Sequence, residues 1–228
     1  MRKLTSSNVK EFMYSIGADL CGIASADDFS EAPEGTHPKD VLPEAKSVIV
    51  FAKRFLKSTA KSNSTIPYTV IRNRISSSID DMSIELAYYL ENEHHTALPA
   101  GAIEPCNWDE TAGRSRGMIS LKHAAELAGL GRIGKNTLLI NKKYGNMIWL
   151  GAVITDLKLV KDKYIEENYC IENCTLCIDN CPAQALYKDT LVMNQSKCWN
   201  HAFSTSGDFI ITCFKCRVLC PLSFGINS

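Results

Sequence analysis

Cysteine is the residue type whose number and spacing in this chain could do chemistry. The sequence holds ten cysteines, and eight of them fall between Cys170 and Cys220. Two stretches have the form Cys-x-x-Cys-x-x-x-Cys-Pro, one ending at Pro182 and the other at Pro221. In bacterial ferredoxins this pattern binds [4Fe–4S] clusters, and the cysteine before the proline is a ligand of the other cluster. The block therefore predicts a bacterial-type two-cluster ferredoxin module.

The reach of each cysteine predicts how the ligands divide between the two clusters. Proline suits the first position of a helix, so the cysteine before it starts a helix that points away from its own loop. We expect crossed ligation, with Cys170, Cys174, Cys177 and Cys220 around one cluster and Cys181, Cys198, Cys213 and Cys216 around the other. Three residues separate Cys170 from Cys174 instead of the usual two, so the spacing leaves open whether Cys170 is a ligand. Without Cys170, that cluster would keep an open iron site.

Structural zinc is the alternative to iron–sulfur clusters, because Cys-x-x-Cys pairs also form zinc ribbons. The third cysteine and the proline that follows it, present in both halves, favour the cluster interpretation. Disulfides are disfavoured, because cytosolic thiols are kept reduced.

Composition limits the compartment and the partners that we expect. Lysine plus arginine (25) equals aspartate plus glutamate (25), so no basic field favours nucleic acid, and we expect nucleic acid to be an unlikely partner. The N-terminus lacks the apolar run of a signal peptide, and no segment approaches the roughly 18 apolar residues of a membrane span. We expect a cytoplasmic protein with no membrane contact.

The elements that must position the cysteines belong to a mixed α and β domain. Apolar residues at three- and four-residue spacing predict helices, and continuous apolar or β-branched runs predict strands. The expected helices are Ser7–Ile16, Val70–Glu93 and Ile119–Leu130, and the expected strands are Asp19–Ala24, Ser47–Ala52, Asn136–Ile140 and Met147–Ile154. A boundary near Lys161 gives a cofactor- or substrate-binding domain over 1–160 and the cysteine module over 161–228.

A Gly-x-Gly-x-x-Gly segment runs from Gly129 to Gly134. A dinucleotide-binding fingerprint follows a strand and opens a helix, whereas this segment follows a helix and precedes a strand. We therefore interpret it as a helix C-cap and a tight turn. Because such a turn exposes backbone N–H groups, Gly131, Gly134, Lys135 and Asn136 are candidate cofactor-binding residues.

Two cysteines and two histidines lie apart from the two cluster sets. Cys21 lies in an apolar strand and is expected to be a small buried hydrophobe. Cys106 is expected to be an ordinary loop cysteine, with a redox or ligand role as the alternative. His123 and His201 have no partners spaced for a metal site, but either could hydrogen-bond a ligand.

Several of these segments together resemble epoxyqueuosine reductases and their relatives, the reductive dehalogenases. The matching strings are Ile16–Ala24, Leu42–Val50, Ala128–Ile140 with Tyr144 and Gly145, Ile154–Leu157, and the paired Cys-Pro motifs with Cys198 between them. They extend over nearly the entire chain, and their order is more specific than the cysteine pattern alone.

The resemblance implies a nitroreductase-like domain that holds cobalamin beside a two-cluster ferredoxin module. The clusters would reduce the corrinoid, which in the queuosine enzyme removes an epoxide oxygen from a tRNA wobble nucleoside. A redox partner such as a ferredoxin or flavodoxin would supply the electrons. The family's catalytic aspartate should precede the glycine-rich segment, where Asp109 is the candidate.

Three functions follow, in our order of preference. The first is an iron–sulfur reductase, cobalamin-dependent or related, that acts on a small molecule. The second is a ferredoxin-type electron carrier with a docking domain. The third is a true epoxyqueuosine reductase, ranked last because the chain ends soon after Pro221, so we expect a short form without the C-terminal extension of the longer reductases.

Overall fold

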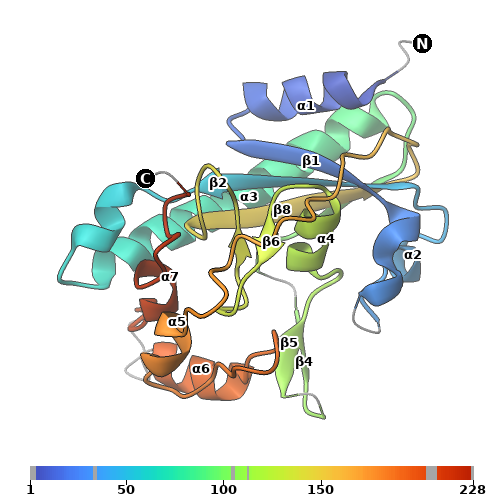
Figure 1. Cartoon of the computed structure of the whole chain (residues 1–228). Helices are drawn as coiled ribbons and strands as arrows, with labels where there is room; N and C mark the ends of the chain where they lie inside the picture. The colour runs from blue at the N-terminus through green and yellow to red at the C-terminus, as the bar shows by residue number, and fades with distance from the viewer. Residues whose placement is uncertain (1–3, 33–34, 104–105, 112, 204–209, 227–228) are drawn as a thin grey trace.

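A four-stranded antiparallel sheet lies at the centre of the chain (Figure 1). The structure is a computed structural model that describes residues 4–32, 35–103, 106–111, 113–203 and 210–226. The strands are ordered β1-β2-β8-β3, with bounds β1 Leu20–Ser25, β2 Ser47–Arg54, β8 Ile148–Thr155 and β3 Ala97–Ala100. Pro99 lies in β3, which is an edge strand and so tolerates a residue without an N–H donor.

Helices cover both faces of the sheet because the central strands are apolar on both faces. Ile49 and Phe51 of β2 belong to the core under α1 (Ser6–Ser15) and α3 (Ile66–Glu91). Val48 and Val50 belong to the opposite core, under α4 (Leu121–Leu127). This alternation is the period of two expected of a strand, and it produces a helix–sheet–helix sandwich.

Shorter elements complete the described part of the chain. Two small hairpins are formed by β4 (Asn107–Asp109) with β5 (Arg114–Arg116) and by β6 (Arg132–Ile133) with β7 (Leu139–Ile140). The connections around the sheet contain η1 (Ala26–Glu31), α2 (Pro38–Val41) and η2 (Lys57–Lys61). The cysteine segment carries α5 (Leu176–Asp179), α6 (Gln195–Ala202) and α7 (Lys215–Val218), which gather at one side of the sheet in Figure 1.

The mixed α and β interior predicted from the sequence is confirmed, but one predicted strand is largely wrong. Of the expected strand Asn136–Ile140 only Leu139–Ile140 is extended, and it pairs with β6 instead of β8. The preceding residues turn back because Thr137 has φ +60° and its N–H donates to the Gly134 carbonyl at 2.8 Å. The predicted C-cap and tight turn are therefore confirmed, with Gly129 at φ +68° after α4.

The cysteine segment is packed against the sheet by aromatic and cationic side chains. The guanidinium of Arg217, a buried residue of α7, lies 5.4 Å from the Phe55 ring centroid and 5.1 Å from that of Trp149. The Phe214 ring stacks on Tyr68 of α3 at 4.0 Å between centroids. These contacts fix the second Cys-Pro stretch relative to the main core.

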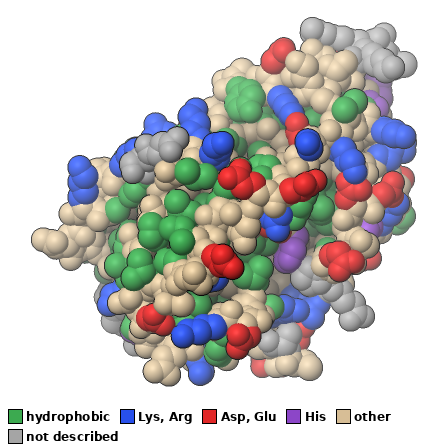
Figure 2. Space-filling model, viewed as in Figure 1, with side chains coloured by type: hydrophobic (Ala, Val, Ile, Leu, Met, Phe, Trp, Pro, Cys, Tyr) green, Lys and Arg blue, Asp and Glu red, His purple; other side chains and the backbone are tan. Residues whose placement is uncertain are grey.

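Acidic and basic side chains are interspersed over the face shown in Figure 2. This mixture agrees with a formal net charge of zero. Among the described residues, no helix combines the length and the apolar character needed to cross a membrane.

Candidate metal centres and the adjoining cavity

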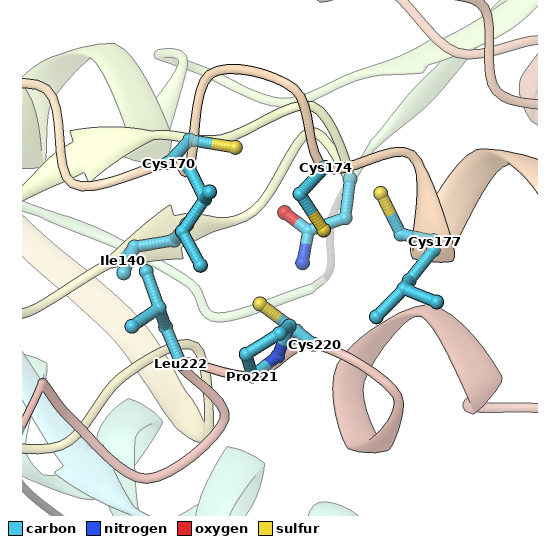
Figure 3. A pocket seen from close by; sticks show the side chains of 10 residues that line it. Ile140, Cys170, Cys174, Cys177, Cys220, Pro221 and Leu222 are labelled. Atoms are coloured by element: carbon cyan, nitrogen blue, oxygen red, sulfur yellow. The ribbon is translucent and has the colours of Figure 1, made fainter.

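The four cysteines of the first predicted set line one hollow. Cys170 and Cys174 come from the loop before α5, Cys177 from α5, and Cys220 from the end of the second Cys-Pro stretch. Figure 3 shows their sulfur atoms directed into a common space. Cys170, the ligand left open by its spacing, is among them. Among the residues that the structure describes, no three His, Cys, Asp or Glu side chains converge tightly enough for a single metal ion.

The wall of this hollow suits an iron–sulfur cluster. Besides the thiols it is largely apolar, with Asn136 as the polar exception and with Ile140, Ile171, Leu176, Pro221 and Leu222 as the apolar residues. An apolar shell limits solvent access, which is one of the features by which a protein sets a cluster's potential. Four soft sulfur donors in such a shell fit a [4Fe–4S] cluster.

The cysteines of the second set are also mutual neighbours. Burial raises the pKa of Cys198 to about 11, and the nearby Cys216, Cys181 and Cys213 raise it further. The pKa of Cys216 is raised mainly by burial, while the adjacent Arg217 opposes that shift. The protonated thiol is thus favoured over the thiolate at both positions. Because a metal binds the thiolate, metal binding there must release protons.

The two sets adjoin each other. Burial raises the pKa of Cys177 in the first set to about 11, and among the thiols that contribute is Cys216 of the second. The short helices that carry these two cysteines, α5 and α7, also pack against each other.

The glycine-rich segment lies between the cysteines and the sheet. An added Cβ at Gly134 would lie 2.5 Å from Ile140 Cδ1, and one at Gly131 would meet the Ile140 carbonyl, so both glycines allow close packing of the β6–β7 hairpin. Lys135 Nζ donates to carbonyls of the first cysteine loop, and Asn136 Nδ2 donates to the Cys216 carbonyl at 3.1 Å. Their role as cofactor ligands stays a prediction.

A cavity of about 490 Å³ opens on the other side of this turn. Its walls come from the end of β3, from the β4–β5 hairpin, from α4 and from residues 191–195 of the cysteine segment. It therefore lies between the sheet core and the part of the cysteine segment that leads into α6. A cavity of this size is typical of a small-molecule or cofactor site.

Basic side chains line this cavity, and sequence reasoning missed most of them. Arg114, Arg116 and Lys122 contribute cationic groups, and His123 adds an imidazole. Lys122 Nζ donates to the Thr137 carbonyl at 2.7 Å, and burial lowers the pKa of Lys122 to about 8, with a smaller contribution from Arg217. Nothing in the amphipathic pattern of α4 marks Lys122, because a lysine on a surface helix is usually solvated.

The predicted histidines fall in different surroundings. His123 Nδ1 lies 2.6 Å from Ser120 Oγ, and its pKa is lowered chiefly by burial. His201 lies on α6, exposed and outside the cavity wall. Of these two histidines, His123 is the one that lines the cavity.

Asp109, the candidate catalytic residue, lies on β4 and forms an ion pair with Arg116. Its carboxylate oxygen is 2.6 Å from Arg116 Nε. Arg116 lines the cavity, so Asp109 is coupled to that site through the arginine.

Comparison with known proteins extends the motif resemblance. No family model matches the chain. The epoxyqueuosine reductase of Staphylococcus aureus is 26% identical over an alignment covering 99% of this chain and 66% of that protein. The Lactococcus garvieae enzyme is 36% identical over 115 residues, which is 46% of this chain and 32% of that protein. The predicted resemblance to epoxyqueuosine reductases is confirmed.

Solved structures of epoxyqueuosine reductases and of a reductive dehalogenase have a similar fold. The Streptococcus thermophilus epoxyqueuosine reductase has a TM-score of 0.65 at 23% identity, over an alignment that covers 96% of this chain and 66% of the reductase. A catabolic reductive dehalogenase has a TM-score of 0.71 at 16% identity, over 94% of this chain and 31% of that one. The chain spans between about one third and two thirds of the first curated relatives that it matches.

One comparison corrects the prediction about partners. A structural relative, with a TM-score of 0.63 at 20% identity over 95% of this chain, is an epoxyqueuosine reductase solved with an epoxyqueuosine-modified tRNA stem loop. The expectation that nucleic acid is an unlikely partner was therefore wrong. It rested on net charge, which does not report how charge is distributed locally, and here arginines gather around the cavity.

Proposed function

We propose that this chain is an iron–sulfur reductase whose reaction is the reduction of epoxyqueuosine in tRNA. One observation carries the proposal: two sets of four cysteines and a cation-lined cavity occur together in a chain similar to epoxyqueuosine reductases over almost its whole length. The cysteine segment then serves as the two-cluster module, and the cavity receives the group to be reduced.

The chain's own residues have distinct parts in this proposal. Eight thiolates hold two [4Fe–4S] clusters, and electrons enter from a partner such as a ferredoxin or flavodoxin. Arg114 and Arg116 bind phosphate or another anionic group of the substrate, as arginines commonly do in nucleic-acid contacts. Lys122, with its pKa of about 8, holds a proton at Nζ at neutral pH and can release it.

The balance of the reaction defines what the site must deliver. Removing the epoxide oxygen as water and leaving a carbon–carbon double bond consumes two electrons and two protons. The clusters are one-electron carriers, so two transfers are needed for each turnover. Lys122 is the proposed source of one proton, and Asp109 remains the carboxylate candidate through its contact with Arg116.

Cobalamin is the additional cofactor that the resemblance implies. The cavity offers cationic and hydroxyl donors, from Arg114, Lys122 and Ser120, beside apolar walls from Met118 and Leu121. These groups suit the phosphate and the ring face of cobalamin, but a cavity of about 490 Å³ would receive only part of so large a molecule. When bound, cobalamin would supply a cobalt centre that can be strongly reducing.

The test is conversion of epoxyqueuosine to queuosine in isolated tRNA. The chain is purified without oxygen, supplied with iron, sulfide and cobalamin, and given a low-potential reductant, and the digested tRNA is analysed by mass spectrometry. We expect conversion by the wild type, loss of about 100-fold or more in Cys216→Ser, and near wild-type conversion in Cys21→Ala, the matched control, which lies in β1 outside both sets and outside the cavity wall. No conversion by a fully loaded wild type would reject this substrate.

Reduction of a small molecule is the second candidate. The volume of the cavity, about 490 Å³, lies within the range usual for small-molecule sites. Cobalt retained through gel filtration without tRNA conversion would favour this function. Eight irons without cobalt would instead favour the electron-carrier interpretation.

A further inference from the structure

The turn from Gly134 to Leu138 contacts segments of both cysteine sets and the cavity wall through three consecutive residues. Lys135 contacts the loop of the first cysteine set, Asn136 contacts a cysteine of the second, and Thr137 contacts Lys122 in the cavity wall. Each contact joins segments distant in sequence. The turn is therefore the point at which the three parts of the proposed site meet.

Lys135 makes the most extensive of these contacts. Its ammonium donates to the carbonyls of Ile171 and Cys174, each at 3.2 Å, and to that of Glu172. An ammonium has three N–H donors, so all three are used by one loop. This loop carries Cys170 and Cys174, the cysteines whose spacing departs from the ferredoxin pattern. Lys135 thus holds the loop by hydrogen bonds at the point where the cysteine spacing is irregular.

Asn136 and Thr137 hold the turn rigid around this lysine. Asn136 is 3% exposed, and its Oδ1 accepts from the Leu138 N–H at 3.2 Å while Nδ2 donates to Cys216. Thr137 has φ +60°, a conformation that a β-branched residue seldom adopts. Such an outlier persists where the surroundings over-determine it, commonly at functional sites.

We propose that Lys135 is a positioning residue of the first cluster: its ammonium holds the Cys170–Cys174 loop in place and, by its charge, raises that cluster's reduction potential. A cluster gains negative charge on reduction, so a fixed cation beside its loop stabilises the reduced form. The second set has its own adjacent cation, Arg217 beside Cys216, which a substitution of Lys135 leaves in place. This inference rests on the proposed iron–sulfur sites.

The experiment is a redox titration of the full chain, loaded with iron and sulfide without oxygen and followed by electron paramagnetic resonance. The signal absent from Cys220→Ser identifies the first cluster. We expect Lys135→Gln to disfavour reduction of the first cluster about tenfold, which corresponds to about 59 mV for one electron, and to leave the second cluster unchanged. Lys188→Gln removes an exposed lysine of the same segment and should change neither potential.

Lys135→Arg keeps the charge and several donors, and should restore the wild-type potential of the first cluster. If Lys135→Gln loses the first cluster altogether, the test rests on Lys135→Arg. A wild-type potential of the first cluster in Lys135→Arg supports the proposal, and a lowered potential contradicts it. A fully loaded Lys135→Gln with both potentials unchanged, or with both shifted equally, would overturn the proposal. Wild-type protein that binds zinc instead of iron would reject the iron–sulfur function itself.

Discussion

Cys220 shows most clearly what single residues contribute to this site. It lies far along the chain from Cys170, Cys174 and Cys177, yet lines the same hollow (Figure 3). The grouping agrees with the spacing of the ferredoxin pattern. The helix expected after each proline does not form, since Pro182 and Pro221 lie in turns that follow α5 and α7. The candidate ligands were thus predictable from local spacing.

Replacing Cys220 with serine should therefore damage the first cluster and spare the second. Serine is a poorer ligand for iron than a thiolate, so we expect about four irons to remain per chain, with the second cluster's resonance intact. Iron analysis and electron paramagnetic resonance measure this outcome. Loss of the cluster that contains Cys213, with the first retained, would contradict crossed ligation.

The two cysteines outside the sets should differ in reactivity. Burial raises the pKa of Cys21 to about 12, whereas Cys106 is exposed. Because the thiolate is the reactive form, iodoacetamide at pH 8 should alkylate Cys106 in the native protein and leave Cys21 unmodified. Peptide mass spectrometry distinguishes the two sites, and denatured protein is the control in which both react. Rapid native labelling of Cys21 would show that it is not buried in β1.

Lys122 should make stability depend on pH in the alkaline range. The pKa of Lys122 is about 8 in the folded chain and 10.5 for an ordinary solvated lysine. Between pH 8 and pH 10.5 the unfolded state therefore binds more protons, and stability rises with pH. The free energy of unfolding of the wild type should rise by about 1–3 kcal/mol relative to Lys122→Met between pH 7 and pH 10.

Urea unfolding at several pH values measures this difference. Lys197→Met, which removes an exposed lysine, is the control and should follow the wild type at every pH. Parallel curves for the wild type and Lys122→Met would contradict a lowered pKa at Lys122.

At the scale of elements, the long regular segments were predictable and the short ones were not. Apolar periodicity identifies α3 and β8, since each buries enough side chains to leave a pattern. The edge strand β3 contains Pro99, and the β4–β5 hairpin has three residues a strand, so neither has a pattern to find. The contacts of Lys135 and Arg217 are long-range, and no local spacing predicts them.

The turn at Gly145 should be essential for the close packing of the end of the cysteine segment. Gly145 has φ +62°, and an added Cβ would meet the Leu222 carbonyl and Ser223 backbone. Gly145→Ala should lower the free energy of unfolding by about 2 kcal/mol or more, from positive-φ strain plus the backbone clash. Because these neighbours directly follow Cys220, the first cluster should be lost before the second.

Gly113→Ala is the matched control for this prediction. Gly113 also has a positive φ, +59°, but its added Cβ would lie 3.7 Å from the nearest neighbouring atom, Ser196 Oγ. Gly113→Ala should therefore lower the free energy of unfolding by the positive-φ strain alone, about 1 kcal/mol. Equal destabilisation by the two alanines in urea unfolding would mean that the contact at Leu222 has no energetic role.

At the scale of the whole molecule, the sheet core and the cysteine segment enclose the cavity between them. Figure 1 shows the cysteine helices and the β4–β5 hairpin on the same side of the sheet. The sequence predicted both parts, but the cavity arises only where they meet, which is why its cationic lining was missed. The partner prediction failed for the same reason, since zero net charge conceals a local cluster of arginines.

The most direct test of this account is the metal and sulfide content of protein purified without oxygen. Two complete cysteine sets predict about eight irons and eight sulfides per chain, and the proposed cavity site predicts near-stoichiometric cobalt after cobalamin is supplied. Zinc at about two atoms per chain, with neither iron nor sulfide, would contradict the account, because zinc has no redox chemistry and could not pass electrons to the cavity.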